Sequence, residues 1–141
     1  MYESKEGKRE TPIIVHRAML GTLDRFMGIL IEQYAGKFPL WLNPEQVRIV
    51  PVAPTFNAYA EEVKKELFAA GLRVEVDDSH ETMNKKIRTA QLDYVNYILV
   101  VGDKEKSEKS VNIRTRDNQV HGMKKVSDFC KELVDEVKNR K

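Results

Sequence analysis

The sequence contains few of the residues that build disulfide-linked, membrane-spanning or cysteine-rich metal proteins. Its single cysteine, Cys130, excludes an internal disulfide and a cysteine-rich metal site. No stretch approaches the roughly 20 apolar residues that a membrane-spanning helix requires, and the N-terminus lacks the apolar core of a signal peptide. With 24 Lys and Arg against 22 Asp and Glu, the net charge is only +2. We therefore expect a cytoplasmic protein that contacts no membrane.

Charge is distributed unevenly along this nearly neutral chain. Acidic residues outnumber basic ones in the range 55–79, whereas Lys and Arg outnumber Asp and Glu in the range 80–125. A basic block of this kind attracts the phosphates of an RNA backbone. Ordinary lysines on a solvated surface explain the same pattern, and charge alone leaves both interpretations open.

The apolar periodicity predicts an α/β fold. Residues with helical spacing alternate with short apolar or alternating stretches, and Gly71 has the position of a left-handed helix cap. We expect helices at 56–70, 82–95 and 126–137, and strands at 47–52, 72–76, 97–101 and 110–116. The last two strands form a hairpin across the charged, turn-prone connection 103–109. Right-handed crossovers make the earlier strands parallel, which gives a mixed, mostly parallel sheet of four or five strands with three flanking helices.

The N-terminal part carries a different pattern. Ile13-Ile14-Val15 is strand-like and leads through the run His16-Arg17-Ala18-Met19-Leu20-Gly21-Thr22 into a predicted helix at 22–35. This helix is apolar on every side, which is typical of a helix buried among neighbours. The preceding residues, rich in Glu, Lys, Arg and Gly, cannot cover it.

These segments resemble class II aminoacyl-tRNA synthetases of the threonyl type. The run from Val15 to Phe26 resembles their motif 3, and Pro39-Leu40-Trp41-Leu42-Asn43-Pro44 resembles the exit from their catalytic domain. Three later segments resemble the threonyl anticodon-binding domain in order and spacing: 84–88, 99–105 and 111–116. The form of 84–92 is closer to the eukaryotic enzymes.

The resemblance implies a division of the chain and a three-layer architecture. Residues 1–11 are expected to be disordered or a tail, 12–45 a motif 3 strand and helix remnant of the catalytic domain, and 46–141 the anticodon-binding domain.

The resemblance also implies residues that read the anticodon. Glu105 and Arg114 match the positions that read the middle anticodon base of threonine tRNA, a guanine. A carboxylate accepts from guanine N–H groups and an arginine donates to O6 and N7. From the residues alone, a surface salt bridge across the hairpin, worth under about 1 kcal/mol, is the alternative. For the third base, His80 and Thr82 occupy the positions of an Asn and a Lys in bacterial enzymes.

Three basic residues near the second predicted helix are further candidates for contacts with bases or phosphates. They are Lys85, Lys86 and Arg88.

Near the N-terminus the resemblance implies parts of an active site. Arg25 matches the motif 3 arginine that clamps ATP, Thr22 lines the threonine pocket, and His16 matches one of three zinc ligands. The other two ligands, motif 2, and motif 1 with its homodimer interface have no counterpart in this sequence. Because a zinc site needs about three or four ligands, we expect no cofactor in this chain and no ligase activity from it alone. The complete enzyme would use ATP with magnesium, and zinc.

We therefore interpret the chain as the C-terminal part of an enzyme that ligates threonine to its tRNA using ATP. Its expected partner is the anticodon loop of threonine tRNA, not DNA. One alternative is a free-standing accessory or regulatory protein with an anticodon domain and no ligase activity. Another is an α/β protein-interaction module. A cytoplasmic location is expected, and a mitochondrial role of the complete enzyme is also compatible.

Overall fold

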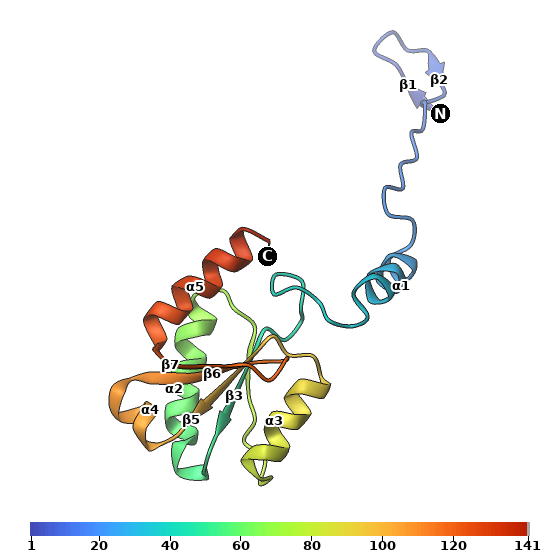
Figure 1. The fold of residues 1–141 in the computed structure, drawn as a ribbon. Helices are drawn as coiled ribbons and strands as arrows, with labels where there is room; N and C mark the ends of the chain where they lie inside the picture. The colour runs from blue at the N-terminus through green and yellow to red at the C-terminus, as the bar shows by residue number, and fades with distance from the viewer. Residues whose placement is uncertain (141) are drawn as a thin grey trace. The chain divides into compact units, whose positions relative to one another are not determined.

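The computed structural model describes residues 1–140, and the chain divides into two compact units at Tyr34 and Ala35. The first unit contains strands β1 (Tyr2–Glu3) and β2 (Arg9–Glu10) and helix α1 (Leu23–Tyr34) (Figure 1). Helix α1 confirms the helix predicted at 22–35. None of the helices within residues 1–140 is long and apolar enough to cross a membrane.

Two expectations for the N-terminal unit differ from the structure. The strand expected at 13–15 is wrong: these residues have no regular structure. A strand needs a neighbouring strand to receive its backbone hydrogen bonds, and none in this unit pairs with them. Where we expected a tail or disorder, β1 and β2 form a short antiparallel hairpin, and Tyr2 donates a 2.9 Å hydrogen bond to Glu10.

The second unit is built on a five-stranded mixed sheet with the order β4-β3-β5-β6-β7. Its strands are β3 (Val47–Pro51), β4 (Val74–Val76), β5 (Tyr97–Val101), β6 (Ser110–Thr115) and β7 (Val120–Lys125). β3 pairs in parallel with β4 and β5, whereas β6 pairs antiparallel with β5 and β7. The sheet is mixed as predicted, although parallel and antiparallel pairings are equally represented. Strand β7 was not predicted from the sequence.

Helices cover both faces of this sheet, which produces three layers (Figure 1). They are α2 (Asn57–Ala69) after a 3-10 turn (Pro54–Phe56), α3 (Met83–Leu92), the short α4 (Asp103–Glu108) and α5 (Val126–Lys138). Gly71 has a φ of +87° just beyond α2, as its predicted capping role requires. The predicted helices correspond to α2, α3 and α5.

Helix α4 replaces the loop expected at 103–109. Its first turn carries Asp103 and Glu105, and acids at a helix N-terminus are favoured by the helix dipole. Glu105 Oε2 also accepts a 3.1 Å hydrogen bond from the backbone N–H of Gly102. This bond satisfies a donor just before the helix, as the acid of a capping box does. The charged stretch therefore forms one and a half turns of helix.

The central strands β3 and β5 are buried on both faces. Ile49, Leu99 and Val101 pack against α2 and α5 in one apolar cluster. Val50, Ile98 and Val100 pack against Ile87 and Ala90 of α3 in a second cluster. We call these two sides of the sheet the α2/α5 face and the α3 face. Burial of 97–101 on both sides was predicted from its continuous apolar sequence.

The segment before β3 is fastened to the second unit by buried amides. Asn43 Nδ2 donates to the carbonyl of Tyr94 at 3.0 Å and to Asn96 Oδ1 at 2.6 Å. Gln46 Nε2 donates to the carbonyl of Leu40 at 2.7 Å.

The Gln46 carboxamide oxygen in turn accepts from the backbone N–H of Arg73 at 2.9 Å. Leu40 itself belongs to the core of this unit. Residues 35–45, which we grouped with the preceding helix, therefore pack as part of the second unit. The functional boundary after residue 45 stays a prediction.

Gln46→Leu is expected to lower the free energy of unfolding by about 1–3 kcal/mol for each buried backbone group left without a partner. The affected groups are the Leu40 carbonyl and the Arg73 N–H. Urea unfolding of the full chain measures the loss. The matched control is Gln91→Leu, which removes only an exposed bond to Asn118 and should change stability by about 0.5 kcal/mol or less. Equal losses in the two variants would contradict the fastening role.

Candidate nucleic-acid interface

The α3 face is only partly covered by its helix. The apolar cluster beneath α3 includes residues of β3 and β5 but none of β6 or β7 within the described chain. On β6, Asn112 and Arg114 pair with Val100 and Ile98. Directly opposed residues of an antiparallel pair project to the same face, so Asn112 and Arg114 lie on the α3 face, beside the helix.

Two apolar residues of β7 complete this uncovered surface. Met123 lies opposite Asn112 and Val120 lies opposite Arg114. Met123 is 46% exposed and Val120 is 56% exposed, whereas Asn112 and Arg114 are half-buried. We call the four residues Asn112, Arg114, Val120 and Met123 the β6–β7 strip. It combines polar groups on one strand with apolar side chains on the next.

A β-bulge interrupts the pairing of β6 with β7 next to Arg114. The register shifts between Ile113 and Arg114, because Ile113 pairs with Gly122 and Arg114 with Val120, leaving His121 as the extra residue. Gly122 adopts a φ of +79°, which glycine reaches without steric cost. Bulges bend a strand and redirect its side chains, and this one lies directly beside the predicted binding arginine.

Glu105 lies over the same face, at the end where β5 leaves the sheet. Ile98 and Val100 project to the α3 face, and Gly102 is the next alternate residue along the chain. A side chain at position 102 would therefore project to the α3 face as well. A methyl group there would lie 3.2 Å from Glu105 Oε2 and 3.4 Å from Val52 Cγ2. The carboxylate therefore covers Gly102 on the α3 face.

Glu105 and Arg114 are thus on one face but toward opposite ends of β5. Arg114 is beside Ile98 and Glu105 is beside Gly102, four residues apart, which corresponds to about 13 Å along a strand. No ion pair or hydrogen bond joins the two side chains within residues 1–140. The salt bridge considered as an alternative is therefore not formed.

A small cavity of about 90 Å³ lies where β3 and β4 end. Val52, which contacts the Gly102 position, lines this cavity together with His80 and Lys86. The carboxyl ends of parallel strands are the usual place for ligands in open α/β sheets. His80 and Thr82 are exposed here, and the Thr82 carbonyl accepts the first backbone bonds of α3.

The three basic residues predicted near α3 have different environments. Lys86 is only 5% exposed, and its Nζ donates a 2.8 Å hydrogen bond to the Asp77 carbonyl. Burial removes Lys86 from the surface residues that can meet RNA, and it instead holds the loop after β4. Lys85 is exposed and forms a 2.7 Å ion pair with Glu81.

Arg88 is exposed, and it lies on the side of α3 that faces the turn between β6 and β7. Residues four and three apart share one side of a helix, so Arg88 shares its side with Asn84 and Gln91. Gln91 Nε2 donates a 3.2 Å hydrogen bond to Asn118 Oδ1 in the turn between β6 and β7. This side of α3 therefore faces the β6–β7 turn, and Arg88 lies on the same side of the helix as Gln91.

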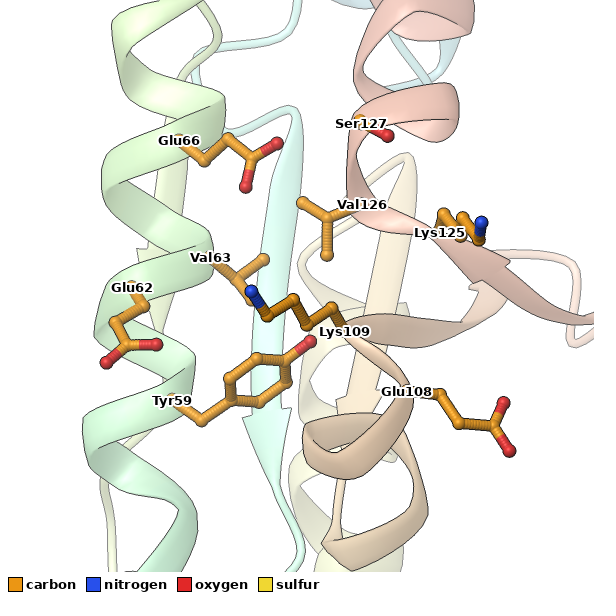
Figure 2. A pocket seen from close by; sticks show the side chains of 9 residues that line it. All are labelled: Tyr59, Glu62, Val63, Glu66, Glu108, Lys109, Lys125, Val126 and Ser127. Atoms are coloured by element: carbon orange, nitrogen blue, oxygen red, sulfur yellow. The ribbon is translucent and has the colours of Figure 1, made fainter.

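A cavity of about 460 Å³ lies on the α2/α5 face, away from these residues. Figure 2 shows the side chains of Tyr59 and Glu66, which extend from α2. It also shows Lys109, the first residue after α4. Tyr59 donates a 2.8 Å hydrogen bond to the Ser110 carbonyl, and burial, followed by the negative charge of Glu66, raises the pKa of its hydroxyl. The lining carries three glutamates, Glu62, Glu66 and Glu108, against the two lysines Lys109 and Lys125, so its charge does not favour a polyanionic ligand.

The N-terminal candidates lie in the first unit. His16, Thr22 and Arg25 are exposed. Thr22 Oγ1 accepts a 3.4 Å hydrogen bond from the Arg25 N–H, as an N-cap residue does at the start of a helix. Residues 1–140 contain no group of three or more His, Cys, Asp or Glu side chains that could hold a metal.

Sequence reasoning did not identify Asn112, Val120 and Met123 as site residues. The alternation of Ser110, Asn112 and Arg114 with apolar residues was a usable signal, because it puts three polar side chains on one face. β7 has little apolar periodicity to predict it, since an exposed edge strand needs no apolar pattern.

Comparison with known proteins relates the second unit to a family. Residues 46–136 match the family described as "Anticodon binding domain". Threonine–tRNA ligase from Finegoldia magna is 50% identical over 140 residues, which are 99% of this chain and 22% of that protein. Threonine–tRNA ligase 2, cytoplasmic, from Xenopus tropicalis is 54% identical over 86% of this chain and 15% of its own length.

A solved structure is similar as well. The RNA binding domain of threonyl-tRNA synthetase from Cryptosporidium parvum Iowa II superimposes with a TM-score of 0.78 and 34% identity. The match covers 86% of this chain and 30% of that one. The chain thus spans only about a fifth of the length of the curated relatives.

Lys86→Ala is expected to lower the free energy of unfolding by about 1–3 kcal/mol, because it leaves the Asp77 carbonyl without its buried donor. The neighbouring control, Lys85→Ala, removes only an exposed ion pair and should cost about 0.5 kcal/mol or less. Thermal unfolding monitored by circular dichroism compares the two variants. A structural role for Lys86 is ruled out if Lys86→Ala is as stable as Lys85→Ala.

Proposed function

This chain belongs to the anticodon binding domain family, and from this membership we propose that it recognises the anticodon loop of threonine tRNA within a threonine–tRNA ligase. The observation that carries the proposal is the uncovered α3 face, where Glu105 and Arg114 lie over the same side of the sheet. The match to threonine–tRNA ligases supports the choice of tRNA.

The chemistry of this surface suits an unpaired base. Single-stranded RNA is read through the exposed edges of its bases and through stacking on side chains. Arg114 supplies N–H donors, and no hydrogen bond or ion pair within residues 1–140 occupies its side chain. Glu105 Oε2 is engaged by the Gly102 N–H, and we assign its second oxygen to the N–H groups of the base.

Together these two residues match the edges of guanine. Guanine offers O6 and N7 as acceptors and carries N–H donors on its pairing edge. Glu105 and Arg114 then read the middle anticodon base, and the bulge beside Arg114 sets the direction of its side chain.

The neighbouring candidates extend the proposal to the rest of the loop. His80, which lines the cavity beside Val52, and the exposed Thr82 two residues later are proposed to meet the third anticodon base. Lys85 and Arg88 are exposed and are proposed to meet phosphates. Since Lys86 is buried, we assign it the positioning of the loop that carries His80.

The wider role is that of the relatives. A complete enzyme of this kind would join threonine to its tRNA using ATP with magnesium, and zinc. In it, Arg25 would contact ATP, Thr22 would line the threonine pocket, and His16 would be one zinc ligand. Dimer formation and a cytoplasmic location are proposed on the same basis.

Arg114→Ala is expected to weaken binding of threonine tRNA by about 1–3 kcal/mol, because the paired donors to the middle base are lost. Wild type should also discriminate against a tRNA whose middle anticodon base is adenine, and Arg114→Ala should lose that discrimination. Fluorescence anisotropy at fixed salt gives both affinities. Lys131→Ala is the control, because Lys131 is an exposed residue of α5, which covers the opposite face.

Binding of all tRNAs with equal affinity by the wild-type chain would contradict sequence readout. A salt dependence that persists without base discrimination would indicate contacts with phosphates alone.

Glu105 has two roles, the proposed recognition of the base and the capping of α4. Its test therefore uses a variant that affects the first role more than the second. Glu105→Gln keeps a side-chain oxygen for the Gly102 N–H but removes the charge that favours base N–H donors. We expect tRNA binding weakened by about 1 kcal/mol or more, and stability lowered by no more than the helix-dipole contribution of about 0.3–1 kcal/mol. Glu105→Ala should lose both binding and stability, because it also removes the cap. If Glu105→Gln binds threonine tRNA like the wild type, Glu105 is only a helix cap.

A further inference from the structure

Three buried side-chain atoms in residues 1–140 have no hydrogen-bond partner in the protein: Ser110 Oγ, Asn112 Oδ1 and Arg114 Nε. All three belong to alternate positions of β6. Side chains at alternate positions of a strand project to the same face. The atoms therefore form one row, and the pairing of Asn112 and Arg114 with β5 places this row on the α3 face.

Such a row is unfavourable unless something satisfies it. A buried polar atom without a partner costs the free energy of its lost hydration. Elsewhere in the second unit the buried amides are satisfied: Asn43 and Gln46 each donate to a backbone carbonyl, and Asn96 donates to the Phe38 carbonyl. The exception at β6 coincides with the surface proposed to meet RNA.

The surroundings of Asn112 fit a planar ligand with polar edges. Met123, directly opposite on β7, offers an exposed and flexible thioether, which makes favourable contacts with aromatic rings. Arg114 lies two residues further along the same face, and Arg88 lies on the side of α3 that faces the β6–β7 turn. Ser110 is only 3% exposed and closes the row at the end near Glu105. Asn112 is half-buried and lies in this row between Ser110 and Arg114.

We propose that Asn112 is a specificity-determining residue for the RNA base bound on the β6–β7 strip. Its carboxamide oxygen accepts an N–H of the base, while the Arg114 Nε–H donates to an oxygen or ring nitrogen of the same base. Met123 supplies the apolar contact under the ring. This inference rests on the proposed function and adds a residue to its site.

A nearly isosteric apolar replacement separates binding from folding. If Asn112 serves the ligand, Asn112→Leu removes an unsatisfied buried atom and does not lower the melting temperature of the free protein. If Asn112 serves the fold, the same change lowers it. Asn96→Leu is the matched control, because Asn96 accepts from Asn43 and donates to the Phe38 carbonyl. Its melting temperature should fall.

The experiment uses the full chain and an anticodon stem-loop RNA of threonine tRNA, with binding followed by fluorescence anisotropy at fixed salt. Asn112→Leu is expected to bind about tenfold more weakly than wild type with a melting temperature that is unchanged or higher. Asn112→Ala should show the same loss of affinity, which guards against a steric effect of leucine. Lys131→Ala should bind like the wild type.

Two results would overturn the inference. One is wild-type affinity in both Asn112 variants while Arg114→Ala is impaired, which would leave the proposed function intact. The other is a fall in melting temperature for Asn112→Leu as large as that for Asn96→Leu, which would make Asn112 a structural residue. Failure of the wild-type chain to bind the stem-loop would overturn the proposed function together with this inference.

Discussion

The whole second unit depends on covering its central strands from both sides. β3 and β5 present apolar side chains to each face, and leaving either face in water would forfeit the burial that stabilises the sheet. Helices α2 and α5 together cover one face. Within residues 1–140 the apolar cluster on the other face includes a single helix, α3, which has 10 residues and is therefore about 15 Å long. The uncovered part of that face is the surface on which β6 and β7 present their side chains.

Several residues link the stability of the unit to this surface. Glu105 holds the start of α4 through Gly102 and also covers the edge of the α3 face. Lys86 fixes the loop after β4, beside His80, through the Asp77 carbonyl. Gln91 ties α3 to the β6–β7 turn through Asn118. The surface proposed to bind RNA is therefore positioned by helix ends and turns that specific hydrogen bonds hold in place.

The parts of the fold that sequence could predict are those with a strong apolar period. β3 and β5 are continuous apolar stretches, and α2, α3 and α5 have clear helical spacing. β7 could not be predicted, because an edge strand with one exposed face carries few apolar residues. The strand expected at 13–15 failed for the opposite reason: its sequence is apolar, but no strand pairs with it. Within the candidate site, Glu105 and Arg114 were predicted from the family resemblance. Asn112 was identified from its unsatisfied oxygen in the structure, although its alternation with apolar residues in β6 was already a sequence signal.

The strand order also carries a consequence for the path of folding. β5, β6 and β7 are consecutive in the chain and neighbours in the sheet, whereas β3 must pair with β5 across the whole of α2, β4 and α3. Closing a long loop costs more conformational entropy than closing a short one. We therefore expect β5, β6 and β7 to assemble early, and β3 to pair with β5 afterwards. The part of the chain that carries the RNA-facing residues would then also be the part that organises the rest.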